Sequence, residues 1–223
     1  MAKIFGYDTE KPFDYENGYW LTSASSRFAK SIAQFEIYKK IVNIPGDIVE
    51  LGVFKGTSLI RLATFREILE SQNSRKILGF DVFGEFPKSV ISDDDKEFIE
   101  NFERQAGYGI GKKELETFLK NKGFTNIELI KGDILETLPK FAKNDALKIS
   151  LLHIDVDVYE PTKFALETLW DKVVRGGVVM LDDYATVAGA TLAIDEFVAE
   201  RNLESIEINK MPYNYIPCFM VKN

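Results

Sequence analysis

Cysteine and histidine are almost missing from this sequence of 223 residues, which contains one of each. The single cysteine, Cys218, cannot form an internal disulfide bond, and the strand-like run around it favours a buried side chain over a catalytic thiol. A single histidine excludes an iron site built on two histidines. Because His153 lies inside an apolar run, we expect it to be a structural, hydrogen-bonded residue, with a proton relay as the alternative.

Long apolar runs and an excess of positive charge are missing too. No apolar run approaches the roughly 20 residues that a membrane-spanning helix needs. Residues 1–10 lack the basic and apolar regions of a signal peptide. A formal net charge of -7 and a pI near 5.0 argue against a surface that binds nucleic acid. We therefore expect a cytoplasmic protein that contacts neither membranes nor nucleic acid and that binds a small molecule.

The apolar content is sufficient for one large α/β domain. Hydrophobic residues make up 45% of the 25.4 kDa chain, so a substantial core can form. We expect a single domain over residues 1–223 that begins with an arm and a helix at 1–44. The aromatic residues of the arm either pack on a bound ligand or dock on the surface of the protein or of a partner subunit; they are Phe13, Tyr15, Tyr19 and Trp20.

The stretch Ile48–Ser58, which reads I-V-E-L-G-V-F-K-G-T-S, predicts a strand that turns sharply into a helix. Glycine lets the backbone approach a ligand, and the helix N-terminus adds free N–H groups and partial positive charge. A dinucleotide fingerprint is disfavoured because Phe54 stands where the second glycine should admit a pyrophosphate. The loop better fits an adenosyl group with an amino-acid tail, with Glu50 near the tail and Asp81 on both ribose hydroxyls.

Apolar runs that alternate with amphipathic segments predict a doubly wound α/β fold with a mainly parallel sheet. After the strand that begins at Ile48, we expect strands at Ile77–Asp81, Ile127–Ile130, Ile149–Ile154 and Val178–Leu181, then two closing strands at Ser205–Asn209 and Cys218–Lys222. The expected helices are Ser26–Val42, Leu59–Leu69, Thr162–Val174 and Thr191–Glu200. Between the helix Thr162–Val174 and the strand Val178–Leu181, we expect Arg175–Gly177 to turn the chain.

Residues 82–123 are too long for a simple connection between a strand and the next one. We interpret part of this segment as a lid or a substrate-selecting insertion that contains a helix through Phe98 and Phe102. Its charged run Ser92–Glu97 is read as the solvated start of that helix.

Five successive predicted strands each end in an acidic residue. The acids are Glu50, Asp81, Asp133, the pair Asp155 and Asp157, and the pair Asp182 and Asp183. Because ligands of an open parallel sheet bind outside the carboxyl ends of its strands, these side chains should gather along one edge. Asp133 taken singly fits the N-cap of a helix equally well.

A cluster of carboxylates without compensation is electrostatically unfavourable, so we expect a cation among them. Either a divalent metal or a cofactor with its own positive charge would supply it. Asp155, Asp182 and Asp183 offer hard oxygen ligands with no cysteine nearby. This set favours Mg²⁺, with Ca²⁺ or Mn²⁺ as alternatives, over Zn²⁺ or iron.

Five motifs, taken together, resemble the macrocin O-methyltransferase family of class I S-adenosylmethionine-dependent methyltransferases. They are E-L-G-V-F-K-G-T-S, G-F-D-V-F-G-E-F-P, G-D-I-L-E-T-L-P, L-H-I-D-V-D-V-Y-E-P-T and R-G-G-V-V-M-L-D-D-Y. The resemblance covers roughly 41–197. It implies a Rossmann-like methyltransferase fold, whose mainly parallel sheet has seven strands with the last one reversed, and helices on both faces.

The resemblance also implies ligands. S-adenosylmethionine would bind over Gly52–Ser58, a stretch that includes Gly56, Thr57 and Ser58, with its ribose on Asp81 and its adenine near Asp133. Mg²⁺ would bind Asp155, Asp182 and Asp183, and Asp157 would act as the base. Coordination to Mg²⁺ makes a sugar hydroxyl more acidic, so that a neighbouring carboxylate can remove its proton.

We therefore expect a Mg²⁺-dependent O-methyltransferase that acts on a sugar hydroxyl, either nucleotide-linked or in a glycoside. One alternative is a phenol or another small-molecule hydroxyl as acceptor, although Val158 replaces the lysine that catechol-type relatives commonly have. A second alternative is a non-catalytic protein that binds S-adenosylmethionine. Tyr159, Glu160 and Tyr184 are candidates for acceptor contacts. The aromatic arm and the habit of the family predict a homo-oligomer.

Overall fold

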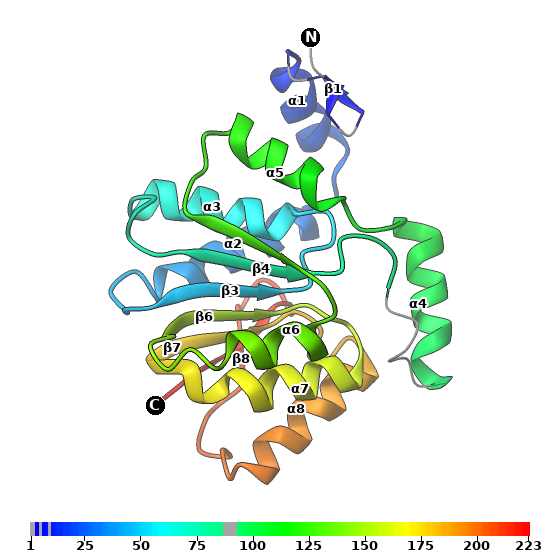
Figure 1. The fold of residues 1–223 in the computed structure, drawn as a ribbon. Coiled ribbons are helices and arrows are strands. Elements are labelled where there is room, and N and C mark those ends of the chain that lie inside the picture. The colour runs from blue at the N-terminus through cyan, green and yellow to red at the C-terminus, as the bar shows by residue number, and fades with distance from the viewer. Residues whose placement is uncertain (1–2, 5, 9, 87–92) are drawn as a thin grey trace.

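The computed structural model describes residues 3–4, 6–8, 10–86 and 93–223, and a seven-stranded sheet lies at its centre (Figure 1). The strand order across the sheet is β5-β4-β3-β6-β7-β9-β8. Neighbours are parallel from β5 to β7, whereas β9 runs antiparallel to β7 and β8 antiparallel to β9. The strands are β3 (Asp47–Leu51), β4 (Ile77–Asp81), β5 (Ile127–Lys131), β6 (Ile149–Ile154), β7 (Val173–Leu181), β8 (Asn209–Lys210) and β9 (Cys218–Val221). The expected parallel sheet with a reversed last strand is confirmed.

Helices cover both faces of this sheet (Figure 1). One face carries α2 (Ser25–Lys39), α3 (Thr57–Leu69) and α5 (Lys112–Asn121), and the other carries α6 (Ile134–Phe141), α7 (Tyr159–Leu169) and α8 (Ala188–Glu200). Strand β6 is buried along its whole length, and its Leu151 packs in one core cluster while Leu152 packs in the other. Such a strand reads as a continuous apolar run because helices cover it from both sides.

Two helices lie outside these layers. They are α1 (Pro12–Thr22), which follows the short strands β1 (Lys3–Ile4) and β2 (Tyr7–Asp8), and α4 (Asp93–Ala106), which stands beside the sheet (Figure 1). None of the side chains of α1 is buried. Helix α4 confirms the expected helix through Phe98 and Phe102. Part of the predicted lid, 87–92, lies outside the described residues. Within the described residues, every helix is too short or too polar to cross a bilayer.

The prediction of a turn at Arg175–Gly177 is wrong, because strand β7 begins at Val173 and runs through these residues. The preceding helix α7 ends at Leu169, and a 3₁₀ turn (Trp170–Lys172) follows it. Gly176 adopts a φ of +78°, which a side chain would resist, and its N–H donates to the carbonyl of Lys222. The glycines thus make an irregular strand with a register shift instead of a turn. The prediction of a closing strand at Ser205–Asn209 is also wrong, because the strand there, β8, consists of Asn209 and Lys210.

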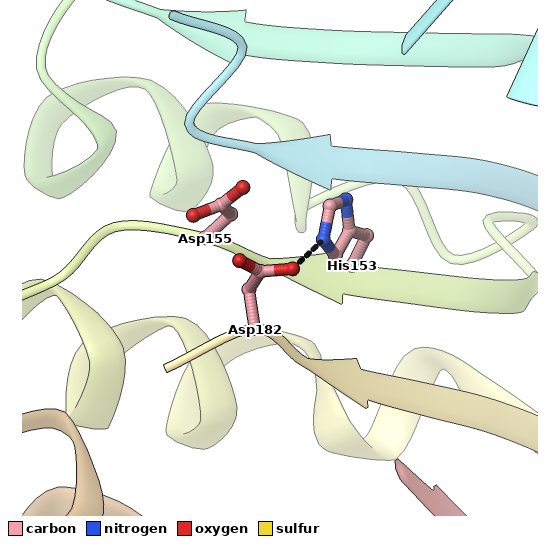
Figure 2. A group of neighbouring side chains, drawn as sticks. All are labelled: His153, Asp155 and Asp182. Atoms are coloured by element: carbon pink, nitrogen blue, oxygen red, sulfur yellow. Dashed lines mark ion pairs between the residues drawn. The ribbon is translucent and has the colours of Figure 1, made fainter. Parts of the chain in front are cut away.

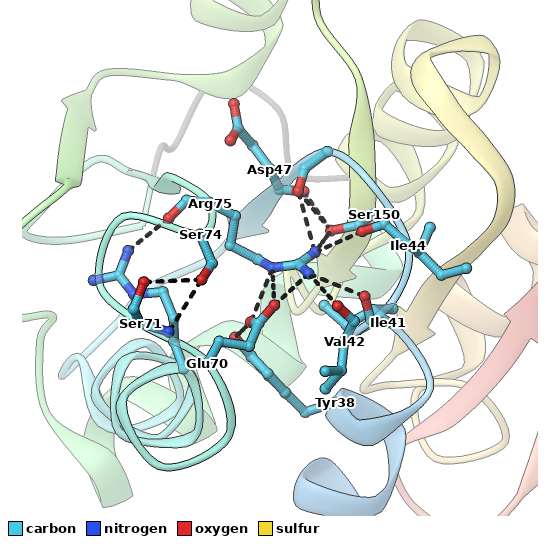
Figure 3. Close-up of polar contacts among 12 residues, drawn as sticks. Tyr38, Ile41, Val42, Ile44, Asp47, Glu70, Ser71, Ser74, Arg75 and Ser150 are labelled. Carbon is cyan, nitrogen blue, oxygen red and sulfur yellow. Dashed lines mark hydrogen bonds and ion pairs between the residues drawn. The ribbon is translucent and has the colours of Figure 1, made fainter.

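A buried arginine ties the amino ends of the central strands to helices α2 and α3 (Figure 3). Arg75 is 6% exposed, and its Nη2 lies 2.5 Å from Oε1 of Glu70. The guanidinium also donates to Oγ of Ser150 and to four backbone carbonyls, those of Ile41, Val42, Ile44 and Gly46. Glu70 accepts a further hydrogen bond of 2.6 Å from the hydroxyl of Tyr38. Without the arginine, the buried Glu70 carboxylate would keep only its hydrogen bond from Tyr38 among these contacts.

We expect Arg75→Met to lower the free energy of unfolding by about 3–5 kcal/mol, because the buried Glu70 carboxylate would lose its counter-charge. Urea denaturation followed by circular dichroism measures this loss. The matched control is Arg201→Met, whose guanidinium pairs with Asp171 at 2.9 Å while both side chains stay exposed. The control should change stability by less than about 1 kcal/mol. Equal effects of the two variants would contradict a structural role for the Arg75 network.

Candidate active site

A cavity of about 360 Å³ lies at the carboxyl ends of the five parallel strands. The residues that follow each strand line it: Gly52 and Phe54 after β3, Asp81 and Val82 after β4, Gly132 and Asp133 after β5, Asp155 and Asp157 after β6, and Asp182 and Asp183 after β7. The sheet therefore brings six of the predicted aspartates around one cavity. Glu50, Gly56, Thr57 and Ser58 do not line it.

The two glycines of the β3–α3 turn are required by the fold itself. Gly52 has a φ of +84°, and a Cβ there would lie 1.7 Å from the carbonyl oxygen of Asp155. Gly56, the N-cap of α3, has a φ of +77°, and its Cβ would meet Leu115 at 2.6 Å. The turn thus packs closely against the exit of β6, which places Gly52 beside the first aspartate of the cluster.

Asp81 stabilises the β3–α3 turn through hydrogen bonds to its backbone. One carboxylate oxygen accepts hydrogen bonds of 2.8 Å from the N–H groups of Val53 and Phe54, and the other accepts one from Phe83. Burial raises the pKa of Asp81, and these three donors oppose the rise. A carboxylate has about four acceptor positions, so one remains for a ribose hydroxyl, where two hydroxyls were expected.

Asp133 is the N-cap of α6, since its Oδ1 accepts a hydrogen bond of 2.9 Å from the N–H of Leu135. The N-cap reading of this residue is confirmed. Asp133 also lines the cavity.

His153 and Glu50 form a buried pair at the ends of β6 and β3. Both side chains are fully buried, and Nδ1 of His153 lies 3.2 Å from Oε1 of Glu50. Glu50 also accepts a hydrogen bond from Oγ of Ser58. The structural, hydrogen-bonded role expected for His153 is confirmed. Glu50 was expected near the cofactor tail; its Oε1 is engaged by Ser58 and His153, its Oε2 is buried without a hydrogen-bond partner, and the residue does not line the cavity.

The acidic cluster consists of two overlapping groups that share Asp155. Ligand atoms of Asp155, Asp157 and Asp183 lie within 4.8 Å of one another, and so do those of Asp155, His153 and Asp182. Figure 2 shows the second group, in which Asp155 and His153 come from the end of β6 and Asp182 from the end of β7. Of the predicted metal ligands, Asp155 belongs to both groups, Asp182 to one and Asp183 to the other.

The carboxyl groups of this cluster have strongly different affinities for protons. Burial, followed by repulsion from neighbouring carboxylates, raises the pKa of Asp155 and Asp183 well above the usual value and that of Asp157 to about 8. Burial opposes ionisation of Asp182 as well, but His153 and Lys30 outweigh it and lower the pKa of Asp182 to about 2. A further positive charge beside Asp155, Asp157 and Asp183 would therefore favour their ionised forms.

Two buried polar atoms in the cluster have no hydrogen-bond partner, namely Nε2 of His153 and Oδ1 of Asp182. They face each other at 3.6 Å, which is ion-pair distance but too long for a hydrogen bond. Buried polar atoms without partners are rare and call for a ligand or an ion. The unpartnered oxygen of Asp182, together with the neighbouring carboxyl groups of the cluster, offers hard oxygen atoms that fit a divalent cation of the Mg²⁺ type.

Lys30 was missed in the sequence analysis. It lies on α2, and its Nζ is 2.5 Å from Oδ2 of Asp182, across 152 positions of sequence. Its side chain is 19% exposed and lines the cavity. The sequence predicted a cation among the aspartates but could not identify it as Lys30. The helical period of apolar residues does not indicate which lysine points at the end of a distant strand.

Without divalent ions, thermal stability should fall as the pH is raised from about 5.5 to about 8.5. A folded pKa of about 8 for Asp157, against 3.8 when unfolded, contributes stability that is present at low pH and lost as the pH rises through 8. His153, raised from 6.5 to about 10 because Asp182 and Glu50 outweigh the effect of burial, acts in the same direction. Asp182, with its lowered pKa, acts only below about pH 4. The loss from Asp157 alone should be about 3 kcal/mol, or about 6–12 °C in Tm.

Differential scanning fluorimetry in chelator-treated buffers measures this dependence. The amide introduced by Asp157→Asn cannot ionise, so the slope of Tm against pH should be smaller in this variant. A Tm that rises with pH over the same range would contradict the raised pKa values described above.

Comparison with known proteins decides the family. The family model described as Macrocin-O-methyltransferase (TylF) matches residues 30–213. The chain belongs to the macrocin O-methyltransferase family. The match extends beyond the five motifs at both ends, and it includes Lys30.

Two curated O-methyltransferases are similar to this chain over about two thirds of its length. The demethyldecarbamoylnovobiocin O-methyltransferase of Streptomyces niveus is 30% identical over 165 residues, which are 71% of this chain and 60% of the relative. A tetracenomycin-C 4'-O-methyltransferase of Streptomyces olivaceus, whose full name includes a dimethoxy-rhamnosyl group, is 28% identical over 149 residues, 64% of this chain and 54% of the relative. The chain therefore spans little more than half the length of these relatives.

Solved structures share the fold. CalS11, a calicheamicin methyltransferase, superposes on this chain with a TM-score of 0.77 at 25% identity. The alignment covers 96% of this chain and 87% of the CalS11 chain. The O-methyltransferase NovP superposes with a TM-score of 0.74 at 21% identity, covering 86% of this chain and 79% of its own. These neighbours confirm the Rossmann-like methyltransferase fold.

Proposed function

We propose that this protein is an S-adenosylmethionine-dependent O-methyltransferase that acts on a sugar hydroxyl, either nucleotide-linked or in a glycoside. The observation that carries the proposal is the single cavity that joins the β3–α3 turn and Asp81 to the acidic cluster at the ends of β6 and β7. A methyl donor and a hydroxyl acceptor can then lie side by side. Family membership, and the rhamnosyl group in the name of the relative from Streptomyces olivaceus, support the sugar acceptor.

The ligands are assigned to the two ends of this cavity. S-adenosylmethionine would lie against Gly52, with its ribose on Asp81, its adenine near Asp133, and its amino-acid tail toward Gly56, Thr57 and Ser58 at the start of α3. A divalent ion such as Mg²⁺ would bind Asp155, Asp182 and Asp183. When bound, the cofactor supplies an electrophilic methyl group and the ion supplies positive charge next to the acceptor hydroxyl.

Asp157 is the proposed general base. Its backbone has a φ of +64°, which is uncommon outside glycine, and its N–H donates to Oδ2 of Asp183 at 3.0 Å. This bond fixes the turn after β6 so that Asp157 reaches the cavity. A pKa of about 8 leaves the carboxyl largely protonated at neutral pH, and a nearby divalent cation would lower that pKa. The ionised carboxylate oxygen can then take the proton of the acceptor hydroxyl.

One observation favours a phenolic acceptor as a second candidate. Phe54 and Phe102 pack with their ring centroids 5.2 Å apart, Phe86 lies 6.4 Å from Phe102, and all three line the cavity. An aromatic wall could hold a flat phenol as well as an adenine or a sugar face.

A methyl-transfer assay with tritiated S-adenosylmethionine tests the proposal. The acceptor panel should include nucleotide sugars, glycosides and simple phenols, each with and without Mg²⁺. Incorporation into a sugar, with loss of the signal in Asp155→Asn, is the expected result. Incorporation only into phenols would favour the second candidate. Cofactor binding by calorimetry with no transfer to any acceptor would instead favour a non-catalytic binding protein.

A further inference from the structure

We propose that Lys30 is an internal cation that occupies Asp182 until a divalent ion displaces it, so that this lysine sets the metal affinity of the site. The inference rests on the proposed function, because it assumes that the acidic cluster binds a divalent ion. It goes beyond that function by assigning a role to a residue of α2 that lies outside every motif in the sequence.

Asp182 has a basic side chain on each side of its carboxylate. Oδ2 lies 2.5 Å from Nζ of Lys30, and Oδ1 lies 3.6 Å from Nε2 of His153. The carboxylate is almost fully buried, so water screens neither contact strongly. A divalent ion that binds Asp182 through Oδ2 must replace Lys30, and one that binds through Oδ1 lies close to the Lys30 charge on the same carboxylate.

Lys30 is the partner that can leave. His153 is fully buried within β6 and is fixed by Glu50 on its other side. Lys30 instead reaches the cluster from α2 on a flexible side chain that is 19% exposed and lines the open cavity. Its charge also interacts favourably with Asp155 and Asp183, so it faces the whole proposed ligand set.

Competition has a specific consequence for metal affinity. A divalent ion and the ammonium group both require the Asp182 carboxylate, and at close range their like charges repel each other in a poorly hydrated site. Part of the binding free energy of the ion is therefore used to separate Lys30 from Asp182. Removal of the lysine charge should tighten metal binding, whereas most charge removals near a binding site weaken or abolish function.

Calorimetric titration of the chelator-treated full chain with Mn²⁺ and with Mg²⁺ tests this inference without any measurement of activity. Lys30→Gln should bind either ion at least about tenfold more tightly than the wild type. Lys30→Arg, which keeps the charge, should stay within about threefold of the wild type. The matched control is Arg27→Gln, which removes a cation one turn earlier on the same helix and at the same cavity. Its gain should be less than about threefold, since long-range repulsion is screened.

Each outcome of the titration distinguishes the two proposals. Metal binding by the wild type without a gain in affinity in Lys30→Gln, or with an equal gain in affinity in Arg27→Gln, would overturn the inference. The proposed metal site would still be supported in either case. Absence of binding in the wild type and in every variant would overturn the metal site and the inference together. Binding in Lys30→Gln alone would support the inference in its strongest form. Thermal melts of each variant confirm that the protein under titration is folded.

Discussion

Asp157→Asn should lower kcat for methyl transfer by about 10²–10⁴-fold, the range expected when a general base is removed. The amide is nearly isosteric with the carboxylate, so the turn after β6 should keep its shape through the bond from the Asp157 N–H to Asp183. The substitution removes only the oxygen that accepts the proton. Stability should not fall, because the raised pKa of Asp157 shows that its ionised form is unfavourable in the fold.

Two further measurements make this result specific. The Kd of S-adenosylmethionine should stay within about threefold of the wild-type value, since Asp157 is assigned to the acceptor and not to the cofactor. Asp145→Asn, at a fully exposed carboxylate near Lys172, serves as the control and should leave kcat unchanged. A kcat for Asp157→Asn within about threefold of the wild type would show that another group takes the proton.

Removal of divalent ions should lower turnover at least about 100-fold, because the positive charge that allows Asp157 to ionise would be lost. Activity should return when Mg²⁺ is added to the chelator-treated enzyme. Asp155→Asn should reproduce the loss, and added Mg²⁺ should not restore it, since Asp155 belongs to both groups of possible ligands. Cofactor affinity measured by calorimetry should be nearly unchanged in all these samples. Equal methyl transfer with and without EDTA would reject the metal mechanism.

The sequence was sufficient to predict the sheet and the gathering of its acidic residues. Each of the five parallel strands carries an acidic residue near its carboxyl end, and parallel strands bring those ends to one edge whatever the details of packing. The same logic could not assign a role to each acid. Asp133 caps α6 and Asp81 holds the β3–α3 turn, and both roles depend on backbone N–H groups whose directions only the folded chain defines.

Two errors have physical causes of the same kind. Gly176 and Gly177 suggest a turn, but the same backbone freedom also permits an irregular strand, and the neighbouring strands β6 and β9 decide between the two. Lys30 could not be identified because its partner is 152 positions away and α2 carries a second lysine, Lys39, whose side chain is exposed. Long-range ion pairs of this kind leave no periodic signal in the sequence.

Diffraction from crystals grown with Mn²⁺ and S-adenosylhomocysteine tests the central claim most directly. Anomalous scattering at the manganese edge should give one peak at the carboxyl edge of the sheet, with Asp155, Asp182 and Asp183 as its protein ligands and with Lys30 moved away from Asp182. The product cofactor should lie beside it, against Gly52. A fully occupied cofactor with no manganese peak among these aspartates would contradict the account.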